Sequence, residues 1–466
     1  MYVNYFWNVP PRVSPRSFIA LQDAGAGSCL YVFKFTDRLE PPNFDTYILV
    51  ENPSDQEAEV FFSLMLEDGT YRKIMKVVPA RSRQTVKVND YTPYKAVSTK
   101  VESSVPVIAE RAMYFDYLGF FKGGHDCSGL PAPGKTWYLA EGYTAEGFDT
   151  YLLLQNPGET EASAKVTYML PGSKTQGETY SVPAHSRKTV SVDSIPGLEA
   201  TELSMRVDSN VDIVAERAMY FEYYGKVGGH VQAGVSSPSD TWQFAEGYTA
   251  EGFDSYVLLQ NPGDSPAHVS LTFMEPDGNT TGETRTIEAH SRDTVKVDDI
   301  GGLSSSEFST SITSDEPIIC ERAMYFDYTG GIDGGHDAVG ASATSTTWHL
   351  AEGYTAGEFD TFVLLSNPSD QTAHVRATFY RSQGTPVTQE FSMAAGTRHT
   401  IETDKIPGLE AAEFSTLIES TNGIGVVAER AVYFSYGSEG WRDGHAALGV
   451  TAPSTDWYFA EGYTGL

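Results

Sequence analysis

Basic residues are scarce in this chain relative to acidic ones. The chain has 32 Lys and Arg against 62 Asp and Glu, which gives a formal net charge of −30. Proteins that hold DNA or RNA place clustered Lys and Arg over the phosphates, and anionic lipids attract basic surfaces in the same way. The composition therefore predicts no nucleic-acid partner and no electrostatic docking to a membrane.

Cysteine, long apolar runs and the common catalytic motifs are missing as well. The 3 Cys residues cannot build a disulfide framework and do not stand at the spacings of metal-binding fingers. No stretch of about 20 apolar residues occurs, so we expect no membrane span. We find no Ser-His-Asp pattern, paired-carboxylate signature, Walker loop or dinucleotide fingerprint, and we expect no enzyme. With 27 Tyr and 24 Phe, the chain can nevertheless bury sizeable cores.

The sequence repeats itself with a period above 100 residues. A Trp-x-x-Ala-Glu-Gly-Tyr-Thr stretch returns at offsets of 105, 106 and 109 residues, beginning at Trp137, Trp242, Trp348 and Trp457. Solenoid repeats have about 20–50 residues, so this period indicates whole domains. The predicted layout is a divergent leader or assembly segment (1–32), four units (33–136, 137–241, 242–347 and 348–456) and a last segment (457–466) that opens a fifth unit or supplies a shared C-terminal strand.

Within the second unit the local pattern is typical of β-strands. Residues 164–169 and 188–193 alternate between apolar and polar side chains, and residues 213–221 form a longer apolar run rich in strand formers. Turn signals separate these segments. Seven or eight short strands in each unit predict an all-β fold class, a tandem array of four immunoglobulin-like antiparallel β-sandwich domains.

A Glu-Arg pair recurs in every unit, at Glu110-Arg111, Glu216-Arg217, Glu321-Arg322 and Glu429-Arg430. Neighbouring strand residues point to opposite faces, so the two members of a pair cannot bind each other. A buried charge needs a partner, and Arg suits a bidentate contact with a carboxylate. Candidate partners are the glutamates of the Ala-Glu-Gly stretch, Glu141, Glu246, Glu352 and Glu461. We predict a structural ion-pair network, with a ligand or metal role as the alternative.

A glycine-histidine element also recurs, at His125, His230, His336 and His445. Asp126 and Asp337 follow two of these histidines and suggest a metal site, but Val231 and Ala446 replace them in the other units. Metal sites need several ligands, so we expect loop histidines that form structural hydrogen bonds with a neighbouring strand. The preceding glycines are expected in a turn with positive φ or at a close backbone approach.

Two further recurring features suggest ligands. Acidic loops carry Glu146 and Asp149, Glu251 and Asp254, and Glu358 and Asp360. Calcium takes several oxygen ligands, so with two carboxylates per loop a calcium site is the alternative and a solvated acidic turn the expectation. Each repeated Trp is expected to pack at a junction between units, with stacking on a sugar ring as the alternative.

The joint motifs also indicate a family. Trp-Tyr-Leu-Ala-Glu-Gly-Tyr-Thr, Gly-Phe-Asp-Thr-Tyr-Leu-Leu-Leu-Gln-Asn-Pro, Ala-Glu-Arg-Ala-Met-Tyr-Phe and Gly-Gly-His occur together. Over residues 33–466 the chain resembles the tandem repeats of uncharacterised secreted proteins of actinobacteria and their relatives. The resemblance implies an extracellular or cell-surface protein and no particular activity. Residues 1–32 do not show the pattern of a secretory signal peptide, so we expect a matured chain or a fragment.

These patterns favour a non-enzymatic structural protein of a bacterial envelope, such as a stalk, surface-layer or filament subunit. Acidity would keep it soluble and discourage sideways association. If the last segment completes the fourth sandwich, a spare strand could add to an open sheet edge of another chain, so we expect self-association into a filament or lattice. The alternative is an adhesin or glycan-binding array that contacts glycans or the cell wall through repeated aromatic and acidic loops, with gain from avidity.

Overall fold

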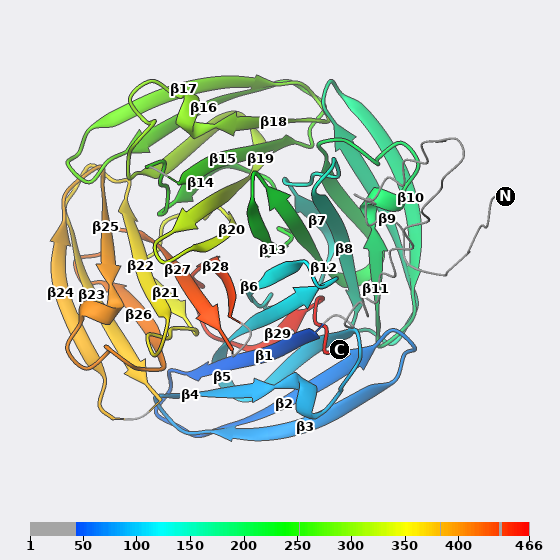
Figure 1. Cartoon of the computed structure of the whole chain (residues 1–466), viewed down its shortest axis with the longest axis horizontal. Helices are drawn as coiled ribbons and strands as arrows, with labels where there is room; N and C mark the ends of the chain where they lie inside the picture. Colours follow the sequence, from blue (N-terminus) through cyan, green and yellow to red (C-terminus); the bar gives the residue numbers. More distant parts are fainter. Residues whose placement is uncertain (1–42, 251, 383, 438–439, 466) are drawn as a thin grey trace, which may run out of the picture.

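Four units surround a common axis in the computed structural model, which describes residues 43–250, 252–382, 384–437 and 440–465 (Figure 1). The predicted leader (1–32) and the start of the first unit (33–42) lie outside these residues. Within them, no helix has the length and apolar character needed to cross a membrane.

The strands of the units follow one another in a repeated order. Unit 1 has β1 (Asn43–Asn52), β2 (Ala58–Leu66), β3 (Tyr71–Val78), β4 (Ser82–Lys87), β5 (Val97–Tyr117), β6 (Phe121–Ser128) and, from the far end of the sequence, β29 (Ser454–Phe459). Unit 2 has β7 (Gly134–Leu139), β8 (Phe148–Asn156), β9 (Ala162–Leu170), β10 (Lys174–Val182), β11 (Ser186–Ser191), β12 (Ser204–Tyr223) and β13 (Lys226–Ala233).

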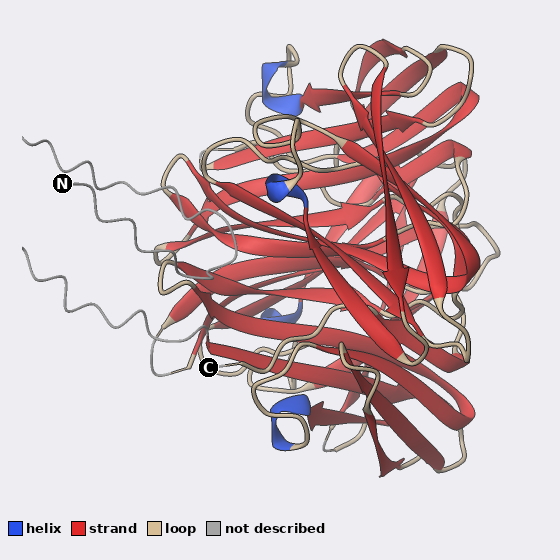
Figure 2. Ribbon diagram, turned by 90° about the vertical axis from the view of Figure 1, so that its right-hand side faces the viewer, coloured by secondary structure: helices blue, strands red, loops and turns tan. Residues whose placement is uncertain are grey.

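Units 3 and 4 repeat this order. Unit 3 has β14 (Ser239–Phe244), β15 (Phe253–Asn261), β16 (Ala267–Met274), β17 (Thr280–Ile287), β18 (Ser291–Lys296), β19 (Ser309–Tyr328) and β20 (Ile332–Val339). Unit 4 has β21 (Thr347–Leu350), β22 (Phe359–Asn367), β23 (Ala373–Arg381), β24 (Val387–Met393), β25 (Thr397–Glu402), β26 (Phe414–Ser420), β27 (Val427–Tyr436) and β28 (Trp441–Leu448). Four single-turn 3-10 helices, η1 (Val88–Asp90), η2 (Val192–Ser194), η3 (Val297–Asp299) and η4 (Thr403–Lys405), lie on one face of the ring (Figure 2).

Each unit consists of two antiparallel sheets that share one long strand or its two halves. In unit 2, residues 204–209 of β12 pair with β9, whereas residues 214–221 pair with β8. In unit 4 the same path is divided between β26 and β27, which belong to separate four-stranded sheets. The all-β, antiparallel prediction is confirmed. The expectation of short strands only is wrong, because one strand of 20 or 21 residues runs through both sheets in units 1 to 3, unlike a strand of an immunoglobulin sandwich.

Burial explains both strand patterns in the sequence. In β9, Ala162, Ala164, Val166 and Tyr168 are buried while Ser163 and Lys165 are exposed, as expected for a strand with one face in a core. Residues 213–221 of β12 are buried without alternation. The first part of this segment contributes Ile213 and Ala215 to the core of unit 2. Other residues pack against both neighbours, Tyr220 against unit 1 and Phe221 against unit 3.

The units close into a ring. The inner strands β6, β13, β20 and β28 surround the axis, and β6 and β20 each lie beside both β13 and β28 (Figure 1). Unit 4 therefore contacts unit 1 as well as unit 3. The tandem units therefore form a closed ring.

The strand β29 completes unit 1. It pairs with β5, with Trp457 opposite Val101, as β7 pairs with β12 with Trp137 opposite Val207. Trp457 and Phe459 belong to the core of unit 1. The expectation that this segment completes the fourth sandwich is wrong, because its side chains fill the core of the first.

Candidate functional site

The repeated charged residues meet at four junctions between units, which we call 1/2, 2/3, 3/4 and 4/1. At each junction, the Arg of one unit contacts the Glu of the Glu-Arg pair in the next unit. The contacts are Arg111–Glu216 at 2.6 Å, Arg217–Glu321 at 2.5 Å, Arg322–Glu429 at 2.5 Å and Arg430–Glu110 at 2.6 Å. The fourth contact joins the last unit to the first, so the chain of ion pairs is closed.

Each guanidinium also binds the Ala-Glu-Gly glutamate on its own side. Arg217 Nη2 lies 2.9 Å from Glu141 Oε2, and the carboxylate of Glu321 accepts hydrogen bonds from the backbone N–H groups of Ala140 and Glu141. The equivalent pairs are Arg322–Glu246, Arg430–Glu352 and Arg111–Glu461, the last of these supplied by the segment after β29. All these side chains are buried. The structure thus brings together the glutamates and arginines singled out in the sequence.

The repeated histidines lie in the inner strands, not in loops. His125, His230, His336 and His445 are at most 2% exposed, and within the described residues none of their ring nitrogens has a hydrogen-bond partner. Burial and the nearby guanidinium lower the pKa of each imidazole well below its ordinary value, so the histidines are neutral. The expectation of hydrogen-bonded loop histidines is wrong.

The glycines before these histidines allow the units to approach closely. Gly124 lies in β6, and a Cβ atom added to it would lie 2.8 Å from the ring of Phe434 in unit 4. Gly229, Gly335 and Gly444 would meet an aromatic ring of a neighbouring unit in the same way. Of the two roles expected for these glycines, a turn with positive φ or a close backbone approach, the structure shows the close approach, since none of them has a positive φ.

The tryptophans do not pack at junctions. Trp137, Trp242, Trp348 and Trp457 are at most 3% exposed and lie in the cores of units 2, 3, 4 and 1. Each indole N–H donates to a backbone carbonyl of the long strand or its equivalent, as Trp137 does to Ile213 at 2.9 Å. The sequence placed these residues at domain boundaries, but their side chains point into the sandwich, where they cannot stack on a sugar ring.

The acidic loops do not assemble a calcium site in the part of the chain that the structure describes, from which Glu251 is left out. The described groups of three potential ligands do not include loop carboxylates. Asp254 instead contacts Lys296 at 2.9 Å, and Asp360 accepts a hydrogen bond from Tyr328 at 3.0 Å. The calcium alternative therefore finds no support in these loops.

Two recurring features have roles that the sequence patterns above do not predict. Arg83, Arg187, Arg292 and Arg398 follow a Ser or Thr in each unit and are buried at the junctions. A Tyr-Phe dipeptide places the Phe of one unit edge-on to the Tyr of the next, with ring centroids 5.0 Å apart for Phe115–Tyr220 and 5.1 Å for Phe434–Tyr114. Both elements keep the repeat period, and that signal could have identified them.

Asp443 occupies the ring axis. Its carboxylate accepts hydrogen bonds from the backbone N–H groups of Gly124, Gly229, Gly335 and Gly444, one from each unit, at 2.8–3.3 Å. In the other units glycine stands at the position of Asp443, and a Cβ atom there would lie within 2.6 Å of this carboxylate. Only one unit can place a side chain on the axis. Burial raises the pKa of Asp443, and the four N–H groups oppose this shift.

Replacing Asp443 by Gly is expected to lower the free energy of unfolding by about 2–4 kcal/mol, since hydrogen bonds to a charged acceptor are worth about 1.5–3 kcal/mol each and are partly replaced by water. Because the four N–H groups form an anion site, formate should restore part of the loss. Urea unfolding with and without formate measures this effect, with chloride at equal ionic strength as the control. Equal stabilisation of wild type and variant by formate would contradict the assignment.

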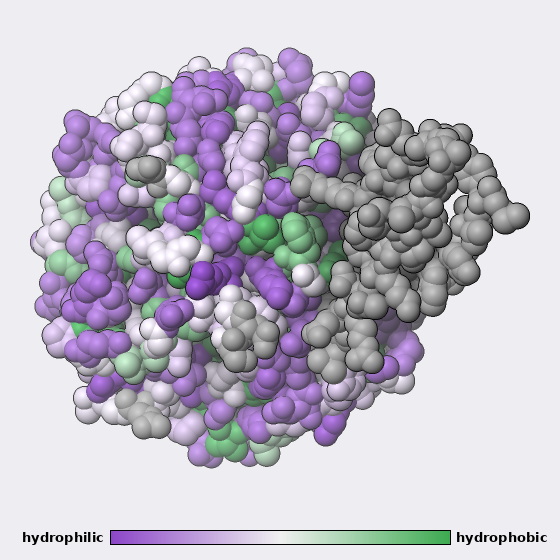
Figure 3. Space-filling model, viewed as in Figure 1, coloured by the Kyte–Doolittle hydropathy of each residue, from purple (hydrophilic) through white to green (hydrophobic). Residues whose placement is uncertain are grey.

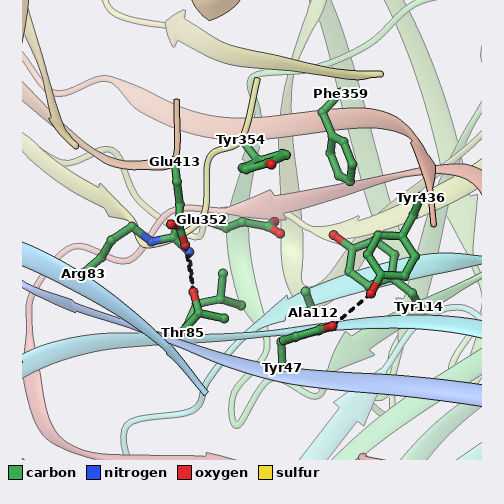
Figure 4. Close-up of a pocket in the computed structure, with 11 residues that line it drawn as sticks. Tyr47, Arg83, Thr85, Ala112, Tyr114, Glu352, Tyr354, Phe359, Glu413 and Tyr436 are labelled. Atoms are coloured by element: carbon green, nitrogen blue, oxygen red, sulfur yellow. Dashed lines mark hydrogen bonds and ion pairs between the residues drawn. The ribbon is translucent and has the colours of Figure 1, made fainter. Parts of the chain in front are cut away.

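Junction 4/1 also carries an open pocket. It has a volume of about 290 Å³ and is lined by Tyr47, Arg83 and Tyr114 from unit 1 and by Tyr354, Glu413 and Tyr436 from unit 4, among others (Figure 4). The hydroxyls of Tyr47 and Tyr436 are 2.9 Å apart, and Thr85 donates to Glu413 at 3.0 Å.

Seen down the axis, hydrophilic residues cover most of the visible described surface, and some hydrophobic residues lie near its centre (Figure 3).

Fold and site together define an all-β repeat protein whose units form a ring through buried charged junctions. The chain belongs to DUF5719, a family of unknown function whose model matches residues 222–456. A search of curated proteins gives no match.

Solved structures give local and weak similarities. A Thermotoga maritima protein, 1070, is 16% identical and covers 22% of this chain and 94% of its own, with a TM-score of 0.21. The Anabaena sensory rhodopsin transducer is 26% identical and covers 19% and 98%, with a TM-score of 0.17. A tetra-tandem repeat from the extending region of a large adhesion protein is 13% identical and covers 87% and 93%, with a TM-score of 0.12. Scores this low carry no argument about function.

Proposed function

We propose that the protein is a non-enzymatic structural protein of a bacterial envelope, exported to the cell surface, in which the ring of four units acts as one rigid block. The observation that carries this proposal is the burial of the repeated arginines. Arg111, Arg217, Arg322 and Arg430 are at most 2% exposed, and each binds carboxylates of two units. Residues used in this way hold the block together and are withheld from a substrate.

Such blocks would assemble into a surface layer, stalk or filament through their outer strands. β3 is the outermost strand of its sheet among the described strands. Its exposed side chains include Tyr71 and Met75, together with the basic residues Arg72 and Lys73. A basic, partly apolar edge on a chain of net charge −30 favours contact with an acidic surface of a second copy.

We therefore expect the purified protein to self-associate as its concentration rises, and the double variant Arg72→Glu/Lys73→Glu to remain monomeric. Light scattering coupled to gel filtration measures the mass, and electron microscopy shows whether the assembly is a filament or a lattice. Lys165→Glu, on the exposed face of β9, is the control and should leave association unchanged. A wild-type protein that stays monomeric at every concentration would overturn this function.

A glycan-binding function is the second candidate, favoured by the pocket at junction 4/1. Aromatic side chains from two units flank a buried Arg and a half-exposed Glu there (Figure 4). Aromatic faces with a few polar groups suit sugar rings, and Tyr354 is 38% exposed. Binding on a glycan array that is lost in Tyr354→Ala but kept in Tyr94→Ala, an exposed tyrosine outside this pocket, would favour this function over the structural one.

A further inference from the structure

Two of the four junctions bring three metal-ligating side chains together. At junction 2/3 these are Glu141, His230 and Asp337, and one ligand atom from each lies within 4.8 Å of the other two. At junction 4/1 the equivalent residues Glu352, His445 and Asp126 form the same group. We propose that each of these two junctions binds one divalent transition-metal ion of the zinc type.

In each cluster, the histidine and one oxygen of the aspartate are buried without a hydrogen-bond partner in the part of the chain that the structure describes, whereas the glutamate contacts the arginine of its junction. Neither ring nitrogen of His230 or His445 has a hydrogen-bond partner among the described residues, nor does Oδ2 of Asp337 or Asp126. All four side chains are at most 2% exposed. Buried polar atoms are almost always satisfied, and leaving one unsatisfied is costly. An ion bound between them would satisfy all three side chains at once.

The spacing of the ligands suits a shared ion. His230 Nδ1 lies 3.7 Å from Glu141 Oε2, and His445 Nδ1 lies 3.6 Å from Glu352 Oε2. Two ligands bound at about 2.0–2.2 Å to one tetrahedral zinc ion are about 3.3–3.6 Å apart. A movement of a few tenths of an ångström would complete the site.

The buried charge also calls for a cation. At junction 2/3, the carboxylates of Glu141, Glu321 and Asp337 face the single guanidinium of Arg217. The second buried arginine there, Arg292, is already paired with Glu202. The ionised cluster therefore carries two uncompensated negative charges, which one divalent ion neutralises.

Protons are the other way to remove this charge. Burial raises the pKa of Glu141 to about 7 and that of Asp337 well above its ordinary value. Protonation would neutralise the carboxylates without a bound ion, so the metal content of the purified protein distinguishes the two.

The remaining two junctions serve as internal controls. Val231 at junction 1/2 and Ala446 at junction 3/4 stand where Asp337 and Asp126 stand. These junctions hold two carboxylates around the central Arg and no described group of three ligands. Their histidines also face the glutamate with the other nitrogen, Nε2, at 3.8 Å for His125 and 3.7 Å for His336. The ring orientation thus changes with the presence of the aspartate.

The ligand set identifies the class of ion. Calcium and magnesium prefer sites built from oxygen atoms, whereas an imidazole with two carboxylates suits zinc and its first-row neighbours. Because the ligands are buried, the ion would be taken up as the chain folds. His230 and Glu141 come from unit 2 and Asp337 from unit 3, so the ion would fasten two neighbouring units.

Metal analysis by mass spectrometry tests the proposal. The full chain, produced with zinc in the medium and dialysed against EDTA to strip exposed histidines, is expected to hold two zinc ions per molecule. Asp337→Ala and Asp126→Val, which copy the natural residues of the other junctions, should each remove one ion and together both. Zinc-free wild type, or unchanged zinc in the double variant, would overturn the proposal.

Matched variants distinguish the loss of a metal ligand from a general loss of folding. His125→Gln/His336→Gln alters only the junctions without the aspartate and should keep both ions, and loss of both ions here would overturn the proposal. His230→Gln/His445→Gln should lose both ions. With cobalt in place of zinc, the wild type should show visible absorption bands of a nitrogen- and oxygen-bound ion, and the latter variant should lack them.

Discussion

Replacing Arg322 by Met is expected to lower the free energy of unfolding by about 3–5 kcal/mol, the cost of leaving buried charges without their partner. Arg322 lies at junction 3/4, where it contacts Glu246 at 2.6 Å and Glu429 at 2.5 Å. The methionine fills similar space, but both carboxylates would remain buried without a counter-charge. Urea unfolding, followed by circular dichroism, measures the change.

An exposed ion pair of the neighbouring sheet provides the control. Arg376 lies 2.9 Å from Glu390, and its side chain is 42% exposed. Pairs of this kind contribute about 0–1 kcal/mol, so Arg376→Met should change stability little. Neutralising the partners of Arg322 as well, with Glu246→Gln and Glu429→Gln, should recover part of the loss. Equal effects of Arg322→Met and Arg376→Met would show that the junction does not hold the ring.

The residues of this network could be predicted from the sequence, but its closure could not. Adjacent positions in a strand point to opposite faces, so the Glu-Arg pair predicts contacts on two sides. The contacts between successive units are the same whether the units form an open row or a ring. Contacts between the last unit and the first, such as Arg430–Glu110 and Arg430–Asp126, distinguish the two, and they depend on the angle accumulated over all four units.

The role of single departures from the repeat was also beyond the sequence. Asp443 replaces a glycine that the other three units share, and Val231 and Ala446 stand where the other two units have an aspartate. In a row of separate domains such changes would be local. In the ring, the carboxylate of Asp443 serves all four units, and Asp126 and Asp337 reach an arginine of the preceding unit. The structural role of these residues depends on distances between units, and the period of a sequence repeat contains no information about those distances.

The β-strands of each unit were easier to predict than the arrangement of the units, because short-range sequence patterns determine the strands. Alternation in residues 164–169 predicts a strand with one buried face, and β9 has that burial pattern. The tryptophans were assigned to junctions because they stand near the start of each repeat. The position of a Trp in the repeat does not give the direction of its side chain. A strand at the start of a repeat can also contribute side chains to the core of that unit, as β7 does with Trp137.

Deleting residues 453–466 is expected to have the largest effect on the ring, with a loss of more than about 5 kcal/mol in the free energy of unfolding. Truncating one buried Trp or Phe costs about 3–5 kcal/mol, and the deletion removes both Trp457 and Phe459 from the core of unit 1. It also removes Glu461, which binds Arg111 at 3.2 Å. Junction 1/2 would then hold Arg111 and Glu216 without their third partner.

Hydrogen exchange locates this loss. Residues 99–102 of β5 pair with β29, so their amides should lose protection in the deletion variant, while residues 205–208 of β12, which pair with β7, should stay protected longer. A synthetic peptide of residues 453–466 should restore protection and raise the melting temperature, and the same peptide with Trp457→Ala should not. A deletion variant that melts like the wild type would show that the ring is held without β29. Rescue by the intact peptide alone would show that the indole of Trp457, with its core contacts and its hydrogen bond to Val107, is needed to hold the ring, because both peptides offer the same backbone hydrogen bonds to β5.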